Sequence, residues 1–177
     1  MKFYSGFSLL NDKEFFKDYM QESNLDIYGF SYGAIAAFEQ AYQSVVCEAK
    51  RVDRVVLFSP AFFQNKPQSF KRVQLQGFAK NPSKYKKKFL QSCFFPCEAL
   101  SMEHNQDGKE ELEELLFYEW SEAKLEQLKD KGVIVEVYLG EKDAIIDTGE
   151  AFEFFVAFAE VHLIKDANHF LQKCSLE

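Results

Sequence analysis

Ser31 is the residue whose surroundings point most directly to chemistry. It is the centre of Gly29-Phe30-Ser31-Tyr32-Gly33, which has the pattern G-x-S-x-G. In that pattern a serine occupies a strained turn from a strand into a helix, and its hydroxyl projects above the sheet. Glycines at both flanks suit such a turn because the strand and helix backbones approach closely there. An apolar run precedes the segment and a helical pattern follows it, so we predict that Ser31 is a nucleophile.

A serine hydroxyl is a weak nucleophile unless a neighbouring base accepts its proton, and histidine commonly serves as that base. The sequence has three histidines, His104, His162 and His169. His162 lies inside a strand-like run and His104 in a polar loop, so we expect these two to be packed and solvated, respectively. His169 follows the last predicted strand, where a parallel sheet presents side chains at its carboxyl edge. We therefore predict His169 as the general base.

The base must be held in one tautomer by an acid, and the acid follows the strand before the last one in the chain order Ser, acid, His. The segment Gly140-Glu141-Lys142-Asp143 is that loop. Asp143 is the predicted acid because it falls just past the strand end. Asp147 is better placed to cap a helix that begins at Thr148. Asp147 and Glu141 remain the alternatives.

An oxyanion formed by attack on a carbonyl needs hydrogen-bond donors. The backbone N–H of Tyr32, the residue after the nucleophile, is one candidate. The backbone N–H of Phe7 is the second candidate, because Gly6 lets the backbone approach a substrate after the first strand. The alternative is that Gly6 is an ordinary turn glycine. A serine mechanism of this kind requires no metal and no cofactor.

The elements that must position these residues alternate between strands and helices, which predicts an α/β fold with a mainly parallel sheet. The chain of 177 residues is expected to form one domain, 1–177. A further short helix is expected after His169. Strands are predicted at 2–5, 25–29, 54–59, 133–139 and 161–164, and helices at 12–21, 32–50, 121–131 and 148–159.

The region at about 64–118, here called the insertion, has charged, helix-forming stretches interrupted by prolines and no clear strand signal. We predict that it forms a helical lid. Seven of the twenty phenylalanines lie in or next to it and could line a channel for an acyl chain, although plain core packing is the favoured explanation for most of them. These are Phe62, Phe63, Phe70, Phe78, Phe89, Phe94 and Phe95.

Charge and cysteine content exclude several classes of protein. A net charge of -7 argues against a surface that attracts nucleic acid. No apolar run is long enough to span a bilayer and the first residues do not look like a signal peptide, so we expect a cytoplasmic protein without membrane contact. Four cysteines are too few for a disulfide scaffold, and we expect them to be free thiols.

In order and setting, the Gly29 to Gly33 segment, the Gly140 to Asp143 loop and Asn168-His169 resemble the α/β-hydrolase superfamily over nearly the whole chain. The short length, the opening Phe3-Tyr4-Ser5-Gly6-Phe7 and the run Leu57-Phe58-Ser59-Pro60 look more closely like BioV-type pimeloyl-acyl-carrier-protein methyl ester esterases of biotin synthesis. The chain departs from that superfamily because only one predicted strand, rather than several, comes before the nucleophile strand, so we expect a minimal α/β-hydrolase fold of about five strands. Its second sheet face should be thinly covered, by the C-terminal helix or by the partner in a homodimer.

The resemblance also implies that the protein hydrolyses the methyl ester of pimeloyl-acyl-carrier protein to methanol and free pimeloyl-carrier protein. Carrier proteins are acidic, and residues 66–88 carry many cations and no Asp or Glu. Such a cluster would steer an acidic partner to the site, unless it only keeps a helical face solvated. The candidate cations are Lys71, Arg72, Lys84, Lys86, Lys87 and Lys88.

Two other functions remain open. The same three residues could hydrolyse a small ester or thioester, in which case the lysines are incidental. Alternatively, an inactive hydrolase fold could bind an acidic protein, because fold does not guarantee activity.

Overall fold

The fold is built on a five-stranded sheet, seen in a computed structural model that describes residues 1–105 and 108–174. All strand pairs are parallel, and the strands lie side by side in sequence order. The prediction of a minimal α/β fold with about five parallel strands is confirmed. The strands are β1 (Lys2–Tyr4), β2 (Asp26–Phe30), β3 (Arg54–Phe58), β4 (Ile134–Gly140) and β5 (Glu160–Ile164).

One face of the sheet is covered by the helices that connect β2 to the later strands. They are α1 (Tyr32–Tyr42), continued by the π-helical turn η2 (Gln43–Cys47), then α5 (Glu122–Asp130) and α6 (Thr148–Phe155). Alternate strand residues face them: Ile27, Val55, Leu57 and Val137 belong to this core. Strands that bury side chains on both faces explain why the sequence shows continuous apolar runs rather than alternation.

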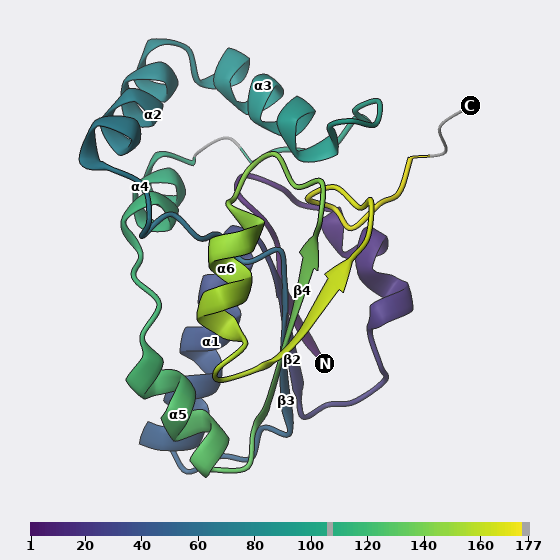
Figure 1. Ribbon diagram of the computed structural model, residues 1–177, viewed down its shortest axis with the longest axis vertical. Coiled ribbons are helices and arrows are strands. Elements are labelled where there is room, and N and C mark those ends of the chain that lie inside the picture. The colour runs from purple at the N-terminus through teal and green to yellow at the C-terminus, as the bar shows by residue number, and fades with distance from the viewer. Residues whose placement is uncertain (106–107, 175–177) are drawn as a thin grey trace.

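The opposite face is covered by the 3₁₀ helix η1 (Asp12–Tyr19), the purple helix in Figure 1. Its Phe16 ring stacks on Phe58 at 4.5 Å between centroids, within a second core that also contains Tyr28 and Phe30. η1 belongs to the connection from β1 to β2, whereas the later connections run over the other face. Because the strands are added in one direction, the β1–β2 connection has the opposite handedness to the others, and a left-handed crossover between parallel strands is rare.

The short helix predicted after His169 does not form between 165 and 174. Leu171 has a positive φ of 59°, and the side chain of Asn168 accepts the backbone N–H groups of Phe170 and Gln172. These local bonds replace those of a helix, as asparagine side chains often do. The resulting turn places the Phe170 ring 4.4 Å from that of Phe94, so this face is closed by aromatic side chains.

The insertion lies between β3 and β4, and its described part consists of helices joined by non-helical segments such as 95–105. It contains α2 (Gln68–Lys80), α3 (Pro82–Phe94) and α4 (Lys109–Phe117). Positions 106 and 107 of the predicted lid, and 175–177 of the predicted domain, lie outside the described residues. Figure 1 shows α2 and α3 above the carboxyl ends of the strands. Within residues 1–105 and 108–174, no helix is both long and apolar enough to cross a membrane.

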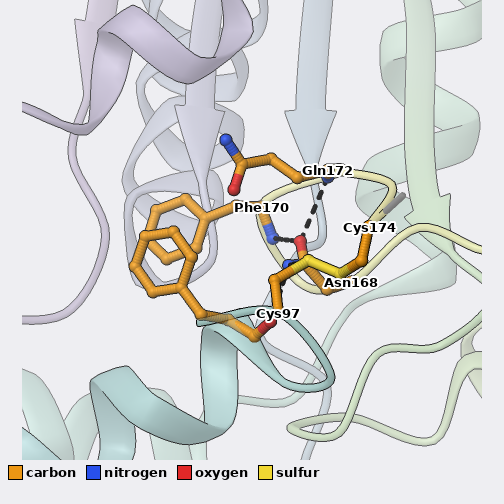
Figure 2. Close-up of a disulfide and its surroundings, with 6 residues drawn as sticks. Cys97, Asn168, Phe170, Gln172 and Cys174 are labelled. Atoms are coloured by element: carbon orange, nitrogen blue, oxygen red, sulfur yellow. Dashed lines mark hydrogen bonds between the residues drawn. A yellow bond between two sulfur atoms is a disulfide. The ribbon is translucent and has the colours of Figure 1, made fainter. Parts of the chain in front are cut away.

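The prediction of four free thiols is wrong for two of them. Cys97, just after α3, forms a disulfide with Cys174 (Figure 2). Cys47 and Cys93 are free. Next to the bridge, the side-chain amide of Asn168 donates to the carbonyl oxygen of Phe94 at 2.9 Å. The end of α3 is therefore tied covalently and by a hydrogen bond to the segment around His169.

A charged cluster fixes the amino-terminal ends of the central strands. The guanidinium of Arg54 donates to Asp26 at 2.7 Å and to Glu136 at 3.0 Å, and all three side chains are largely buried. Burial alone would lower the pKa of Arg54, but its hydrogen bonds to both carboxylates outweigh that effect and leave the pKa raised.

Replacing Arg54 with alanine is expected to lower the free energy of unfolding by about 3 kcal/mol, because two buried carboxylates then lose their counter-ion. Urea unfolding followed by circular dichroism measures the change. Arg51→Ala is the control: Arg51 pairs with Asp53 on the surface and its loss should have little effect. Equal stability of the two variants would contradict a stabilising role for this cluster.

Candidate active site

Ser31 sits at the junction of β2 and α1 and has backbone angles that few non-glycine residues adopt, φ 52° and ψ −113°. A Cβ atom at Gly33 would lie 2.1 Å from the carbonyl oxygen of Tyr4, and one at Gly29 would lie 2.2 Å from that of Gly33. No side chain fits at either position. The two glycines therefore permit the tight turn that holds Ser31 above the sheet.

The structure brings Ser31, His169 and Asp143 together in one hydrogen-bonded chain. Nε2 of His169 lies 3.0 Å from Oγ of Ser31, and Nδ1 lies 2.6 Å from Oδ2 of Asp143. The three residues come from the ends of β2, β5 and β4. The side chains of His169 and Asp143 are fully buried. A neutral imidazole with its proton on Nδ1 satisfies both contacts, since Nε2 then accepts from the serine hydroxyl.

Asp143 is held in turn by the loop that carries it. Its second oxygen, Oδ1, accepts the backbone N–H of Ile145 at 2.7 Å. The alternative acids are engaged elsewhere: Asp147 caps α6 through the N–H of Glu150, and Glu141 accepts the N–H of Asp166. Among the three candidate acids, only Asp143 contacts the histidine.

The other histidines take structural positions. Nδ1 of His104 lies 3.2 Å from the carbonyl oxygen of Ser8, and the ring of His162 stacks on Tyr138 with centroids 4.5 Å apart. Neither contacts Ser31. His162 is packed as predicted, but the prediction that His104 is solvated is wrong, because His104 is half-buried and forms a β-bridge with Leu9.

The two predicted oxyanion donors lie on neighbouring segments. Tyr32 is the first residue of α1, so its N–H has no partner inside the helix. The loop after β1 adjoins this turn, since the carbonyl oxygens of Tyr4 and Ser5 would both contact a Cβ at Gly33. Within the described residues, the N–H of Phe7 in that loop makes no hydrogen bond. Both groups are available to an oxyanion.

Sequence reasoning missed three side chains around this site, Cys93, Glu111 and Asp12. Burial and the nearby charge of Asp143 raise the pKa of the Cys93 thiol, which therefore stays neutral beside the acid. Burial also raises the pKa of Asp12, which accepts the N–H of Gly6 at 2.7 Å. In the sequence, Asp12 is only the first residue of the helix predicted at 12–21, and nothing pairs Glu111 with the start of the chain.

A cavity of about 550 Å³ extends from Asp143 between the insertion and the loop after β4. Its walls are mainly apolar and include Phe63, Phe70 and Phe89, three of the seven phenylalanines considered for a channel. Phe62, Phe78 and Phe94 are buried in the cores instead, and Phe95 is exposed. Lys66 and Lys88 also line the cavity. An elongated apolar group with a polar or anionic end fits such a lining.

The candidate cations of the insertion divide into two groups. Lys71 is buried with its ammonium 5.2 Å from the centre of the Phe117 ring, and Lys86 is buried and donates to the carbonyl oxygen of Asn105 at 2.8 Å. These two hold the insertion together. The exposed cations are Arg72, Lys84, Lys87 and Lys88.

Comparison with known proteins gives similarity of structure without similarity of sequence. No protein-family model matches the sequence, and no curated protein matches it significantly. Naproxen esterase (carboxylesterase NP) from Bacillus subtilis is similar at a TM-score of 0.58 and 16% identity, over 96% of this chain and 76% of the esterase. BioG from Haemophilus influenzae is similar at a TM-score of 0.56 and 11% identity, over 96% of this chain and 87% of BioG. A bromoperoxidase from Bacillus anthracis is similar at a TM-score of 0.60 and 15% identity, over 84% of this chain and 62% of the bromoperoxidase.

The chain spans only 54% to 62% of the length of several structures that it matches. At these identities the likeness concerns the fold. The parallel strand order, the serine turn after β2 and the agreement with several solved structures lead to one conclusion: the chain has a minimal α/β-hydrolase fold.

Proposed function

We propose that the protein is a serine carboxylesterase in which Ser31 is the nucleophile, His169 the general base and Asp143 the residue that orients the histidine. The observation that carries the proposal is the unbroken series of contacts from Ser31 through His169 to Asp143, at 3.0 Å and 2.6 Å. Distances of this size permit proton transfer from the hydroxyl as it attacks.

In the reaction, Oγ of Ser31 attacks the ester carbonyl carbon while its proton moves to Nε2 of His169. Asp143 stabilises the imidazolium that forms. The N–H groups of Tyr32 and Phe7 bind the oxyanion of the tetrahedral intermediate. His169 then protonates the departing alcohol, and a water molecule releases the acyl group from Ser31 by the same steps in reverse roles.

We further propose the methyl ester of pimeloyl-acyl-carrier protein as the substrate. Two features support it beside the sequence resemblance. The apolar cavity next to Asp143 suits an extended aliphatic chain. Arg72, Lys84, Lys87 and Lys88 are exposed on α2 and α3, where an acidic carrier protein could approach the cavity.

The test is to incubate the purified protein with pimeloyl-acyl-carrier-protein methyl ester and to follow the mass of the intact carrier protein. We expect loss of the methyl group with the wild type and none with Ser31→Ala. Turnover by the serine variant would exclude the serine mechanism. Absence of turnover with both proteins would exclude this substrate.

A small ester is the second candidate, and the burial of Lys71 and Lys86 favours it, since these lysines serve the packing of the insertion rather than a partner. Ionic strength separates the two candidates. Turnover of the carrier-protein ester should fall steeply as salt is raised, whereas turnover of a neutral small ester should stay nearly constant. Labelling of Ser31 by a fluorophosphonate distinguishes both from an inactive fold that only binds an acidic protein.

A further inference from the structure

The loop after β1 contains three consecutive backbone N–H groups, of which the first and the third donate to carboxyl groups and the second does not. The N–H of Gly6 donates to Oδ2 of Asp12 at 2.7 Å, and that of Ser8 donates to Oε2 of Glu111 at 2.7 Å. The N–H of Phe7, between them, has no partner in the part of the chain that the structure describes. Two carboxylates thus fix the peptide units on either side of the one that would bind an oxyanion.

The two carboxylates reach the loop from opposite sides. Asp12 is the first residue of η1 and is fully buried, whereas Glu111 lies in the first turn of α4 and is contributed by the insertion. Both N–H···O distances are 2.7 Å, at the short end of the range for such bonds. The rotation of the peptide between Gly6 and Phe7 is therefore limited at both of its ends.

Glu111 is itself held in place. Its Oε1 atom accepts the side-chain amide of Asn105 at 2.9 Å, and Oδ1 of Asn105 accepts the hydroxyl of Ser8 at 2.8 Å. The backbone N–H of Asn105 also donates to the carbonyl oxygen of Ser8 at 3.1 Å. Ser8, Asn105 and Glu111 are thus hydrogen-bonded to one another. Asn105 orients both the donor and the acceptor of the bond from Ser8 N–H to Glu111.

We propose that Glu111 is a positioning residue for the oxyanion hole, acting through Ser8 on the N–H of Phe7. The proposal rests on the proposed serine esterase function and assigns a catalytic task to the insertion beyond covering the site. Ser8 has a positive φ of 58°, a conformation that a non-glycine residue leaves readily once its contacts are lost. Without Glu111 the loop can therefore relax, and the N–H of Phe7 loses its alignment.

The expected effect falls on the chemical step. An oxyanion donor acts on charge that develops in the transition state, so its displacement lowers kcat and leaves substrate binding nearly unchanged. For Glu111→Ala we expect kcat to fall by about 10- to 100-fold, with KM within about two-fold of the wild-type value.

Glu111→Gln should restore most of the activity. The carbonyl oxygen of the glutamine can accept the N–H of Ser8. If the Asn105 amide flips, the NH₂ group of the glutamine can donate to Oδ1 of Asn105. We expect kcat within about three-fold of wild type for this variant. Glu110→Ala is the matched control, because Glu110 shares the first turn of α4 but is exposed. It should leave both kinetic constants unchanged.

The experiment measures kcat and KM with p-nitrophenyl butyrate for the wild type and the three variants. In parallel, fluorophosphonate labelling of wild-type Ser31 tests the proposed function on its own. The affinity for a trifluoromethyl ketone, whose adduct with Ser31 carries an oxyanion, should fall with kcat in Glu111→Ala. Thermal melting monitors the fold. If Glu111→Ala does not fold, Asn105→Ala replaces it. That change removes the hydrogen bond that orients the Glu111 side chain but keeps its carboxylate group, and kcat should again fall.

An unchanged kcat in a folded Glu111→Ala protein would overturn the inference, as would a loss confined to KM. A loss in Glu111→Gln as large as in Glu111→Ala would also overturn it, because the glutamine keeps the acceptor. Failure of the wild type to label or to turn over any ester would instead overturn the proposed function. The two failures are therefore distinguishable.

Discussion

Exchanging Asp143 for asparagine is expected to lower kcat by about 10⁴-fold while the protein remains folded. The asparagine amide fills the same space and can still accept the N–H of Ile145 through its oxygen. It cannot stabilise an imidazolium, and its NH₂ group favours the histidine tautomer with the proton on Nε2. In that tautomer His169 no longer accepts the proton of Ser31. Steady-state kinetics on a small ester measures the loss.

Asp147→Asn provides the matched control for this prediction. Asp147 caps α6, and asparagine caps a helix as well as aspartate does. Activity and melting temperature should therefore stay at the wild-type values. Loss of activity in Asp147→Asn with retention in Asp143→Asn would show that the acid had been assigned to the wrong residue.

Removing the disulfide, by the double change Cys97→Ser and Cys174→Ser, is expected to lower the free energy of unfolding by about 4 kcal/mol. The bridge joins residues that are 77 positions apart, so it restricts a large part of the unfolded chain. The loop of His169 lies inside that closed segment. Activity should therefore be lost at a lower denaturant concentration than in the wild type.

Equilibrium unfolding in urea, with and without a thiol reductant, measures this effect. The wild type in reductant should match the double variant in stability, and reductant should leave the double variant unchanged. Cys47→Ser is the control, since Cys47 is a free and exposed cysteine. A wild-type protein whose stability does not respond to reductant would contradict a stabilising bridge.

The sheet and the three central site residues were open to prediction because each depends on local pattern and chain order. A strand followed by a glycine-flanked serine fixes one residue, and the order of parallel strands places the loops of Asp143 and His169 at the same edge. The choice of Asp143 over Asp147 followed from the capping preference of a helix start, and the structure shows both residues in those positions.

The features that the sequence did not reveal depend on contacts between distant segments. Neither spacing nor composition pairs Cys97 with Cys174, or Glu111 with Ser8, because both contacts form only when the insertion folds back over the sheet. Likewise, Lys71 and Arg72 are neighbours in the sequence, yet only the first is buried. A helix rotates successive side chains to different faces, so a run of cations does not define a surface.

The placement of the insertion between two adjacent strands has a consequence for how the chain folds. β3 and β4 pair in register from Arg54 with Ile134, so the central pairing of the sheet closes a segment whose described part contains four helices, α2 to α5. The entropy of closure grows only slowly, by about 0.6 kcal/mol for each doubling of the loop. Such a sheet can therefore tolerate a long insertion in equilibrium. The effect is on the folding rate. The β2–α1–β3 unit can form from contacts that are local in sequence, whereas β3 and β4 are far apart in sequence and pair slowly. We expect the pairing of β3 with β4 to limit the folding rate.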